Sequence, residues 1–240
     1  MLNNFKYFFF EKVSSTNSEI KKIYEAKSFK DSLALLSNFQ LNGKGRSKNK
    51  WISKPGDFTA SYLLNEHFSI PNLGQLNIVS SVAILKALKC LYKNVIFKLK
   101  WPNDIIVDRK KIGGILLESK IHRNNVEFLI IGLGLNIFSS PTDIKYKTAK
   151  ITDYSNNINN KYLFKLIGNW LIKYINKFKK KGFNSFREEW IKNAVDIGQF
   201  IKIKVNKKNY YGKFLKIDTQ GSLILQVKNV TMKFSYGEIG

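Results

Sequence analysis

The spacing of apolar residues changes once along this chain, and the change divides it into two parts. Over residues 163–178, Leu, Ile, Trp, Tyr and Phe side chains recur every three or four positions, which is the period of an amphipathic helix. From Gly198 onward the period falls to two, and over residues 201–205 apolar residues alternate with lysines, as in a strand with one buried face. We therefore predict a larger domain over residues 1–195 and a small β-barrel over residues 196–240.

The larger part mixes the signals of strands and helices, which indicates an α+β fold. Short β-prone apolar segments predict strands, and longer segments with helical spacing predict helices. The predicted strands are 6–12, 32–39, 58–64, 96–100, 105–108, 111–119 and 126–137, the predicted helices are 18–27, 73–92, 163–178 and 184–193, and the predicted strands of the barrel are 201–205, 211–217 and 223–227. The polar, Asn-rich stretch 141–160 predicts a loop. We expect a mixed β-sheet with flanking helices, followed by the small β-barrel.

The charge of the chain raises the question of nucleic acid. There are 41 Lys and Arg residues against 17 Asp and Glu residues, for a net charge of +24, and such an excess suits a nucleic-acid-binding module. All but four of these cations are lysines, and they are spread along the whole chain rather than gathered on one element. We therefore attribute the charge to solvated faces.

Cysteine content and apolar runs indicate the compartment. The one cysteine, Cys90, lies inside an apolar run, which predicts a buried free thiol in a reducing compartment. The apolar stretch 7–10 is too short for a signal sequence, and no run reaches the ~18 apolar residues of a membrane span. We expect a cytoplasmic protein without a membrane partner.

A glycine-rich basic loop is the first motif that indicates a ligand. In the run Gly43-Lys44-Gly45-Arg46 the glycines let the backbone approach a ligand closely, and the two cations can attract phosphate oxygens. A flexible basic loop has the same composition, so the run alone decides nothing. It matches neither the P-loop pattern nor the dinucleotide-binding fingerprint.

A second motif, KWPND over residues 100–104, precedes KIGGIL over residues 111–116. Lys100 and Lys111 flank a predicted hairpin, and a lysine is a point charge suited to a carboxylate or a phosphate. Two adjacent glycines inside a strand predict a ligand that lies against the backbone. A plain hairpin with surface lysines is the alternative, although Trp101 would be unusual in a polar turn.

A third motif, GLGLN, covers residues 132–136. Its two strand glycines again predict that something approaches closely, although a bulge or tight packing would also use them. Asn136 at the end of the strand offers both a donor and an acceptor.

In their order and spacing these motifs resemble the biotin protein ligases. The resemblance runs through Ser15-Thr16-Asn17, Gln40, the loop 43–46, Trp51, KWPND, KIGGIL, GLGLN and Gly237-Glu238-Ile239, so it covers nearly the whole chain. KWPND followed by Lys-x-Gly-Gly-Ile-Leu is its most specific part. It implies a class II synthetase-like catalytic domain with a C-terminal SH3-like barrel. It also implies an enzyme that makes biotinyl-5'-adenylate from biotin and ATP, with Mg²⁺, and transfers biotin to a lysine of the biotin carboxyl carrier protein of acetyl-CoA carboxylase.

The resemblance also implies the roles of individual residues. The implied catalytic residues are Lys111, Arg46 and Lys100; the implied biotin-binding residues are Ser15, Thr16, Asn17, Gln40, Lys44, Gly45, Arg46, Lys111, Gly114, Leu116, Gly132 and Gly134; the implied ATP-binding residues are Gly43, Lys44, Arg46, Trp51, Asp104 and Asn136. No protein-bound metal is implied. At position 44 the family usually has Arg, and because Lys cannot make a planar bidentate contact, how tightly the loop retains the adenylate stays open.

The same resemblance leads to expectations about partners. The first predicted strand begins within ten residues of Met1, so we expect no N-terminal DNA-binding domain and no DNA partner. Family members can pair through the edge of the sheet, and a homodimer therefore stays open.

Three alternatives stay open besides the biotin ligase. A lipoate or octanoate ligase or transferase shares the fold, but the Arg-Arg-x-Ser-Gly-Gly-Gly stretch and the catalytic cysteine expected of it are missing from the sequence. A nucleic-acid-binding module would expose Tyr210, Tyr211, Phe214 and Phe234 between lysines of the barrel. A biotin-binding module without catalysis would have lost Lys111, which is present.

Overall fold

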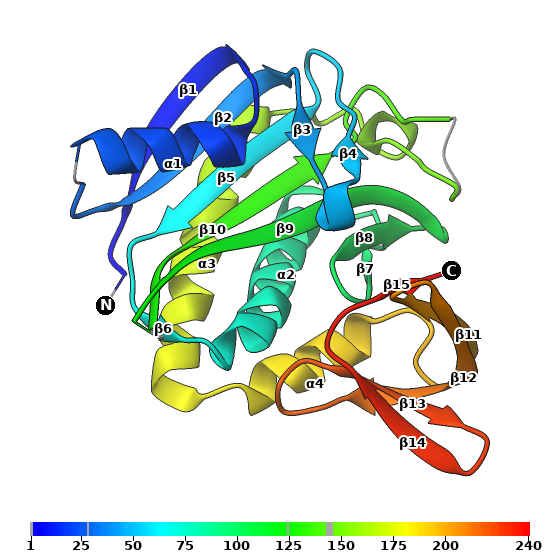
Figure 1. Ribbon diagram of the computed structural model, residues 1–240. Helices are drawn as coiled ribbons and strands as arrows, with labels where there is room; N and C mark the ends of the chain where they lie inside the picture. The colour runs from blue at the N-terminus through cyan, green and yellow to red at the C-terminus, as the bar shows by residue number, and fades with distance from the viewer. Residues whose placement is uncertain (1, 28, 124, 143–145) are drawn as a thin grey trace.

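A mixed, eight-stranded β-sheet forms the centre of the molecule (Figure 1). The computed structural model describes residues 2–27, 29–123, 125–142 and 146–240. The strands in spatial order are β1 (Phe5–Val13), β2 (Ser32–Gln40), β5 (Phe58–Leu64), β10 (Asn125–Leu135), β9 (Lys110–His122), β8 (Asp104–Val107) and β7 (Lys98–Lys100), and β6 (Phe68–Ser69) pairs with β10. Only β1 and β2 run parallel; the other described neighbours are antiparallel.

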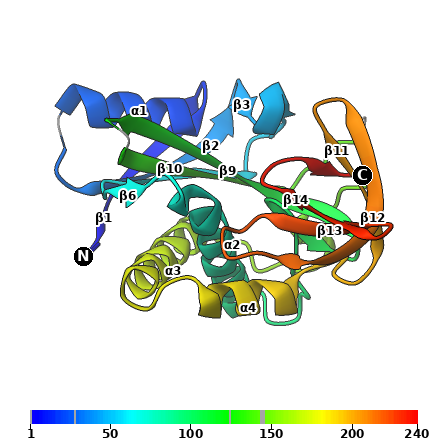
Figure 2. The ribbon, with the colours of Figure 1, turned by 60° about the horizontal axis from the view of Figure 1, so that its bottom comes forward.

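Helices cover both faces of this sheet, as Figure 2 shows. Helix α1 (Thr16–Lys27) lies on one face, and α2 (Asn72–Leu91), α3 (Asn160–Lys181) and α4 (Asn184–Asn193) lie on the other. The predicted α+β class, with a mixed sheet and flanking helices, is therefore confirmed.

Burial on two faces explains why β2 reads as a continuous apolar run. Leu33 and Leu35 pack under α1, in a small core with Ile20 of the helix. Ala34 and Leu36, which alternate with them, point into the large core on the opposite side of the sheet. A strand that is covered on both faces needs apolar residues at every position rather than at every second one.

Helix α2 runs through the large core. By length and hydropathy it could cross a membrane, but 61% of its apolar window is buried inside the protein, as in a core helix. Cys90, in its last turn, is exposed, so the prediction of a buried thiol is wrong. The apolar run misled because successive residues of a helix point about 100° apart, and Cys90 falls on the face turned away from the core.

The C-terminal part forms a second, antiparallel sheet. Its strands in spatial order are β14 (Val230–Phe234), β13 (Leu223–Val227), β12 (Lys208–Ile217), β11 (Phe200–Val205) and β15 (Glu238–Ile239). Inward-facing Ile203, Phe214 and Leu225 are fully buried and belong to the same core as α2 and α3. Because one core continues through both parts, the division at residues 195 and 196 stays a prediction, as does closure of the small sheet into an SH3-like barrel.

Several predicted segments differ in their bounds from the structure: the strands predicted at 111–119 and 211–217 are Lys110–His122 and Lys208–Ile217, and the helix predicted at 163–178 is Asn160–Lys181. The predicted strand 96–100 is shorter, because β7 begins at Lys98 and Ile96 is 72% exposed. The predicted loop 141–160 contains a 3-10 turn, Ile151–Asp153, and its residues 143–145 lie outside the described part of the chain.

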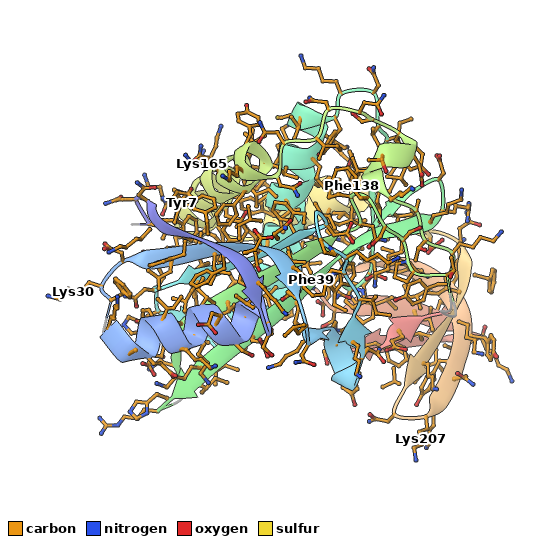
Figure 3. The ribbon with its side chains drawn as sticks, turned by 90° about the horizontal axis from the view of Figure 1, so that it is seen from above. Tyr7, Lys30, Phe39, Phe138, Lys165 and Lys207 are labelled. Atoms are coloured by element: carbon orange, nitrogen blue, oxygen red, sulfur yellow. The ribbon has the colours of Figure 1, made fainter. Side chains whose placement is uncertain are left out.

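The lysines occupy separate parts of the surface. Figure 3 shows three of them at different places on the periphery: Lys30 on the connection after α1, Lys165 on α3, and Lys207 on the turn between β11 and β12. This distribution agrees with a solvating role for most of the positive charge.

Candidate active site

The basic loop forms a short hairpin over the sheet. Its strands β3 (Gly43–Lys44) and β4 (Lys50–Trp51) pair with each other, and Figure 1 shows them in front of β10 and β9. The 3-10 turn Arg46–Lys48 connects the two strands. A cavity of about 610 Å³ lies between this hairpin and β9. It is lined by Asn42, Gly43, Lys44, Gly45, Arg46, Ser47, Asn49, Lys50, Leu116 and Glu118.

The strand glycines make room for side chains of the chain itself. A Cβ at Gly132 would overlap the amide of Asn17, and one at Gly134 would overlap the indole of Trp51. Gly114 lies within van der Waals reach of Trp51. Gly113 points to Leu135 in the core, so the prediction that a ligand lies against it is wrong. The other three glycines border the site through the side chains that cover them.

The packing of Trp51 on Gly134 leads to a testable expectation. Gly134→Ala should destabilise the protein by about 1–3 kcal/mol, because the added methyl group displaces the indole. In a Trp51→Ala background the same change should cost almost nothing, because the overlap is gone. Urea unfolding of the two single variants and the double variant measures this coupling. Additive losses would show that Gly134 meets something other than Trp51.

Lys111 lies near the start of β9 with its ammonium group held on several sides. Its Nζ is 2.7 Å from Asp104 Oδ1, 4.9 Å from the ring centre of Tyr146 and 5.9 Å from that of Trp51. Its backbone pairs with the segment after β10, since its N–H donates to the carbonyl of Lys147 at 2.9 Å. The cation is therefore held in place, and its side chain is only 17% exposed to water.

Arg46 ties the hairpin to the C-terminal sheet. Its Nη1 donates to the carbonyl of Gly237 at 3.2 Å and to Asn103 Oδ1 at 3.4 Å. Burial lowers the pKa of Arg46, and the nearby carboxylates of Asp104 and Glu238 oppose that shift. A guanidinium keeps its proton in proteins, so Arg46 brings a partly buried positive charge to the edge of the cavity.

Four of the predicted biotin-binding residues, Ser15, Thr16, Asn17 and Gln40, meet at the N-terminal end of α1. Gln40 Oε1 accepts from the backbone N–H of Thr16 at 2.7 Å and from its hydroxyl at 3.0 Å. Ser15 and Asn17 are buried beside them. Lys44 is nearby on the surface, where its Nζ donates to Ser18 Oγ at 2.8 Å.

Five of the predicted site residues line the cavity, namely Gly43, Lys44, Gly45, Arg46 and Leu116, and the others lie outside its lining, with Lys111, Asn136 and Lys100 among them. Asn136 is 2% exposed, and its Nδ2 donates to the carbonyl of Ala149 at 3.0 Å, so it holds the segment that follows β10. Lys100 is in register with Asp104 on the β7–β8 hairpin and does not line the cavity.

Sequence reasoning missed Glu118 and Asp57. Glu118 lines the cavity, and the period of two along β9 puts it on the same face as Gly114 and Leu116, which was a usable signal. Asp57 is 1% exposed, and its Oδ1 accepts from the backbone N–H groups of residues 137–139 at 2.9, 2.9 and 3.1 Å. An aspartate after Pro-Gly reads as a surface turn residue, so nothing in the local sequence indicated this anchor.

Three of the four aromatic residues that a nucleic-acid-binding module was expected to expose are not exposed on the C-terminal sheet, although Phe200 of β11, which was not among the four, is 82% exposed. Phe214 and Phe234 are buried, and Tyr210 packs against Phe234 with ring centres 5.0 Å apart. Of the four aromatic residues named for that alternative, only Tyr211 is exposed, at 62%.

This fold and site define a member of a known enzyme family. The family model described as "Biotin/lipoate A/B protein ligase family" matches residues 9–136, and the chain belongs to that family. The chain is 25% identical over 222 residues to the biotin–[acetyl-CoA-carboxylase] ligase of Paracoccus denitrificans, with 90% of this chain and 92% of that protein covered. It is also 25% identical over 214 residues to the bifunctional ligase/repressor BirA of Bacillus subtilis, with 85% of this chain covered, and spans about 65% of that relative's length.

A solved structure agrees with these matches. The biotin protein ligase from Aquifex aeolicus, in complex with biotin and ATP, superposes with a TM-score of 0.83 and 25% sequence identity, and 98% of each chain is covered.

Proposed function

We propose that this chain is a biotin protein ligase. It forms biotinyl-5'-adenylate from biotin and ATP and transfers biotin to a lysine of a biotin carboxyl carrier protein. The observation that supports this most directly is the Lys111 ammonium, which Asp104 holds at 2.7 Å near the rings of Trp51 and Tyr146. The Paracoccus relative is named for acetyl-CoA carboxylase, which makes the carrier of that enzyme the first substrate to test.

In the first step the biotin carboxylate attacks the α-phosphorus of ATP. A P–O bond forms, the bond to the β-phosphate oxygen breaks, and pyrophosphate leaves. Both reactants are anions, so the site must supply positive charge where they meet. We assign this role to Lys111, with Arg46 and Lys44 of the hairpin on the other side of the nucleotide. No enzyme nucleophile is needed.

In the second step the ε-amine of the carrier lysine attacks the carbonyl carbon of the adenylate. An amide bond forms, AMP leaves with the electron pair of the broken C–O bond, and the attacking nitrogen loses a proton. Water would destroy the adenylate by the same attack, so the hairpin that covers the cavity has to exclude it. The contacts of Arg46 with Gly237 and of Asn49 with Glu238 support such a cover.

Magnesium enters this scheme with the nucleotide. Mg²⁺ is usually held by the phosphates of ATP together with one or two carboxylates, rather than by a cage of protein ligands. Within the described residues no three His, Cys, Asp or Glu side chains are grouped to hold a metal. Because Mg²⁺ is bound mainly by the phosphates of ATP, we treat it as part of the substrate. A cytoplasmic location and a homodimer stay predictions.

Tyr146 is the residue that we assign to the adenine ring. It is 51% exposed and lies over Lys111, next to the reacting phosphate in this scheme. Tyr146→Ala should raise KM for ATP by about tenfold, because stacking of a base on an aromatic ring contributes ~1–3 kcal/mol. Tyr146→Phe should retain most of the affinity. Tyr162→Ala, which removes an equally exposed tyrosine from α3, is the matched control. An unchanged KM in Tyr146→Ala would remove it from the nucleotide site.

Transfer to the carrier tests the proposed function. The chain, biotin, MgATP and a biotin carboxyl carrier domain are incubated, and the carrier mass is followed. We expect one biotinyl group on one lysine, and no product when that lysine is replaced by arginine. Labelling of the carrier with lipoate or octanoate, but not with biotin, would contradict the proposal in favour of the other branch of the family.

A further inference from the structure

The buried amide of Asn17 lies in a network that fixes which way it points. Asn17 Nδ2 donates to Glu118 Oε2 at 2.7 Å, and Ser61 Oγ donates to Asn17 Oδ1 at 2.5 Å. Asn17 is 4% exposed and Ser61 is fully buried. The three residues come from α1, β5 and β9, so the network joins three parts of the sheet face that α1 covers.

The sheet register explains how these residues come together. Gly132 of β10 pairs with Ser61 on one side and with Leu116 on the other. The Asn17 amide rests on Gly132, where any side chain would overlap it. Glu118 lies two residues beyond Leu116 on the same face of β9. The Asn17 amide thus packs on the backbone of Gly132 and has a hydrogen-bond partner at each end, Glu118 at its nitrogen and Ser61 at its oxygen.

Ser61 and Glu118 differ in the kinds of hydrogen bond that they can make with the Asn17 amide. A serine hydroxyl can donate or accept, but an ionised carboxylate only accepts. If the amide were reversed, its oxygen would face the Glu118 carboxylate, and two acceptors would repel each other. Glu118 therefore decides the orientation, and Ser61 follows it. One N–H and one lone pair of the amide remain for another partner.

Position along β9 indicates which part of the ligand would meet this amide. From Gly114, beside the Lys111 ammonium, to Glu118 is four residues, or about 13 Å along a strand. With the biotin carboxylate at Lys111, the ureido ring extends toward Glu118. A ureido group presents an N–H and a C=O side by side, which an amide of fixed orientation can match.

We infer that Glu118 is a positioning residue for biotin recognition: it fixes the Asn17 amide so that one donor and one acceptor face the ureido ring. This inference rests on the proposed function. Glu118 acts through Asn17 and takes no part in the chemical step, so its loss should weaken biotin binding and leave ATP binding and the chemical rate unchanged.

Two substitutions of Glu118 separate its role in positioning Asn17 from the effect of its negative charge. Glu118→Ala and Glu118→Gln remove the same negative charge, but only the glutamine can still accept from Asn17. We expect KM and Kd for biotin to rise by about tenfold or more in Glu118→Ala, as for loss of a hydrogen bond to a charged group, and clearly less in Glu118→Gln. A purely electrostatic role predicts equal effects, and tighter binding, because biotin is an anion.

The experiment measures biotin binding by calorimetry, then KM for biotin, KM for ATP and kcat for adenylate formation. Glu127→Gln is the matched control, because it removes a carboxylate from β10 that contacts Lys120 at 3.2 Å on the surface. Thermal unfolding shows whether each variant is folded. If Glu118→Ala does not fold, Ser61→Ala disrupts the same network from its other end. The inference would be overturned if Kd and KM for biotin were equal in the wild type and the Glu118 variants, or if only KM for ATP changed. A wild-type chain that neither binds nor adenylates biotin would overturn the proposed function itself.

Discussion

Lys111→Ala is expected to slow biotinyl-adenylate formation by about 10²- to 10³-fold, the usual effect of removing a preorganised charge from a reacting centre. The ammonium is held by Asp104 at 2.7 Å and is largely shielded from water, so bulk solvent does not supply the same charge at that point. The rate is measured in single turnover, with saturating biotin and ATP labelled at the α-phosphate.

A neighbouring residue offers a close control for this substitution. Lys110 precedes Lys111 on β9 and is exposed, so Lys110→Ala removes one positive charge from the same strand without touching Asp104. It should form the adenylate at nearly the wild-type rate. Equal losses in the two variants would mean that the general positive field, and not the held ammonium, drives the step.

Trp101→Ala is expected to give the largest loss of stability, about 3–5 kcal/mol in the free energy of unfolding. Trp101 is 2% exposed, and its indole N–H donates to the carbonyl of Gly221 at 3.1 Å, so it joins the WPND turn to the small sheet. This position explains why a tryptophan stands in a polar turn. Urea unfolding measures the loss.

A conservative variant separates packing from the hydrogen bond at this junction. Trp101→Phe retains most of the apolar contact and should lose only about 1–2 kcal/mol, for the hydrogen bond and the buried carbonyl left without it. A loss in Trp101→Phe as large as in Trp101→Ala would show that the hydrogen bond, rather than the packing, holds the two sheets together.

The elements of this fold could largely be predicted from the spacing of its apolar residues. The helix around Leu166 and the strand from Ser32 were predicted because burial on one face or on both leaves a direct pattern in the sequence. Cys90 was placed wrongly because an apolar neighbourhood does not say which way a helical residue points. The pairing of strands distant in sequence, such as β10 with β5, leaves no local pattern at all.

The site was predictable to the extent that its residues lie in contiguous motifs. The structure places the loop 43–46 beside β9 and holds Lys111 on Asp104 of the KWPND motif. What could not be predicted is how glycines and side chains share space. Gly132 and Gly134 were expected to face a ligand directly, yet the structure places Asn17 and Trp51 over them. Such contacts depend on the approach of segments that are far apart in the chain.

Activation of biotin is the step on which the proposed function depends. The most direct test incubates the purified protein with MgATP and, separately, with biotin, lipoate or octanoate, and measures acyl-adenylate and pyrophosphate. We predict that, of the three acids, only biotin gives an acyl-adenylate, with one pyrophosphate released for each adenylate formed. An adenylate from lipoate or octanoate but none from biotin would contradict the account and place the chain in the other branch of its family.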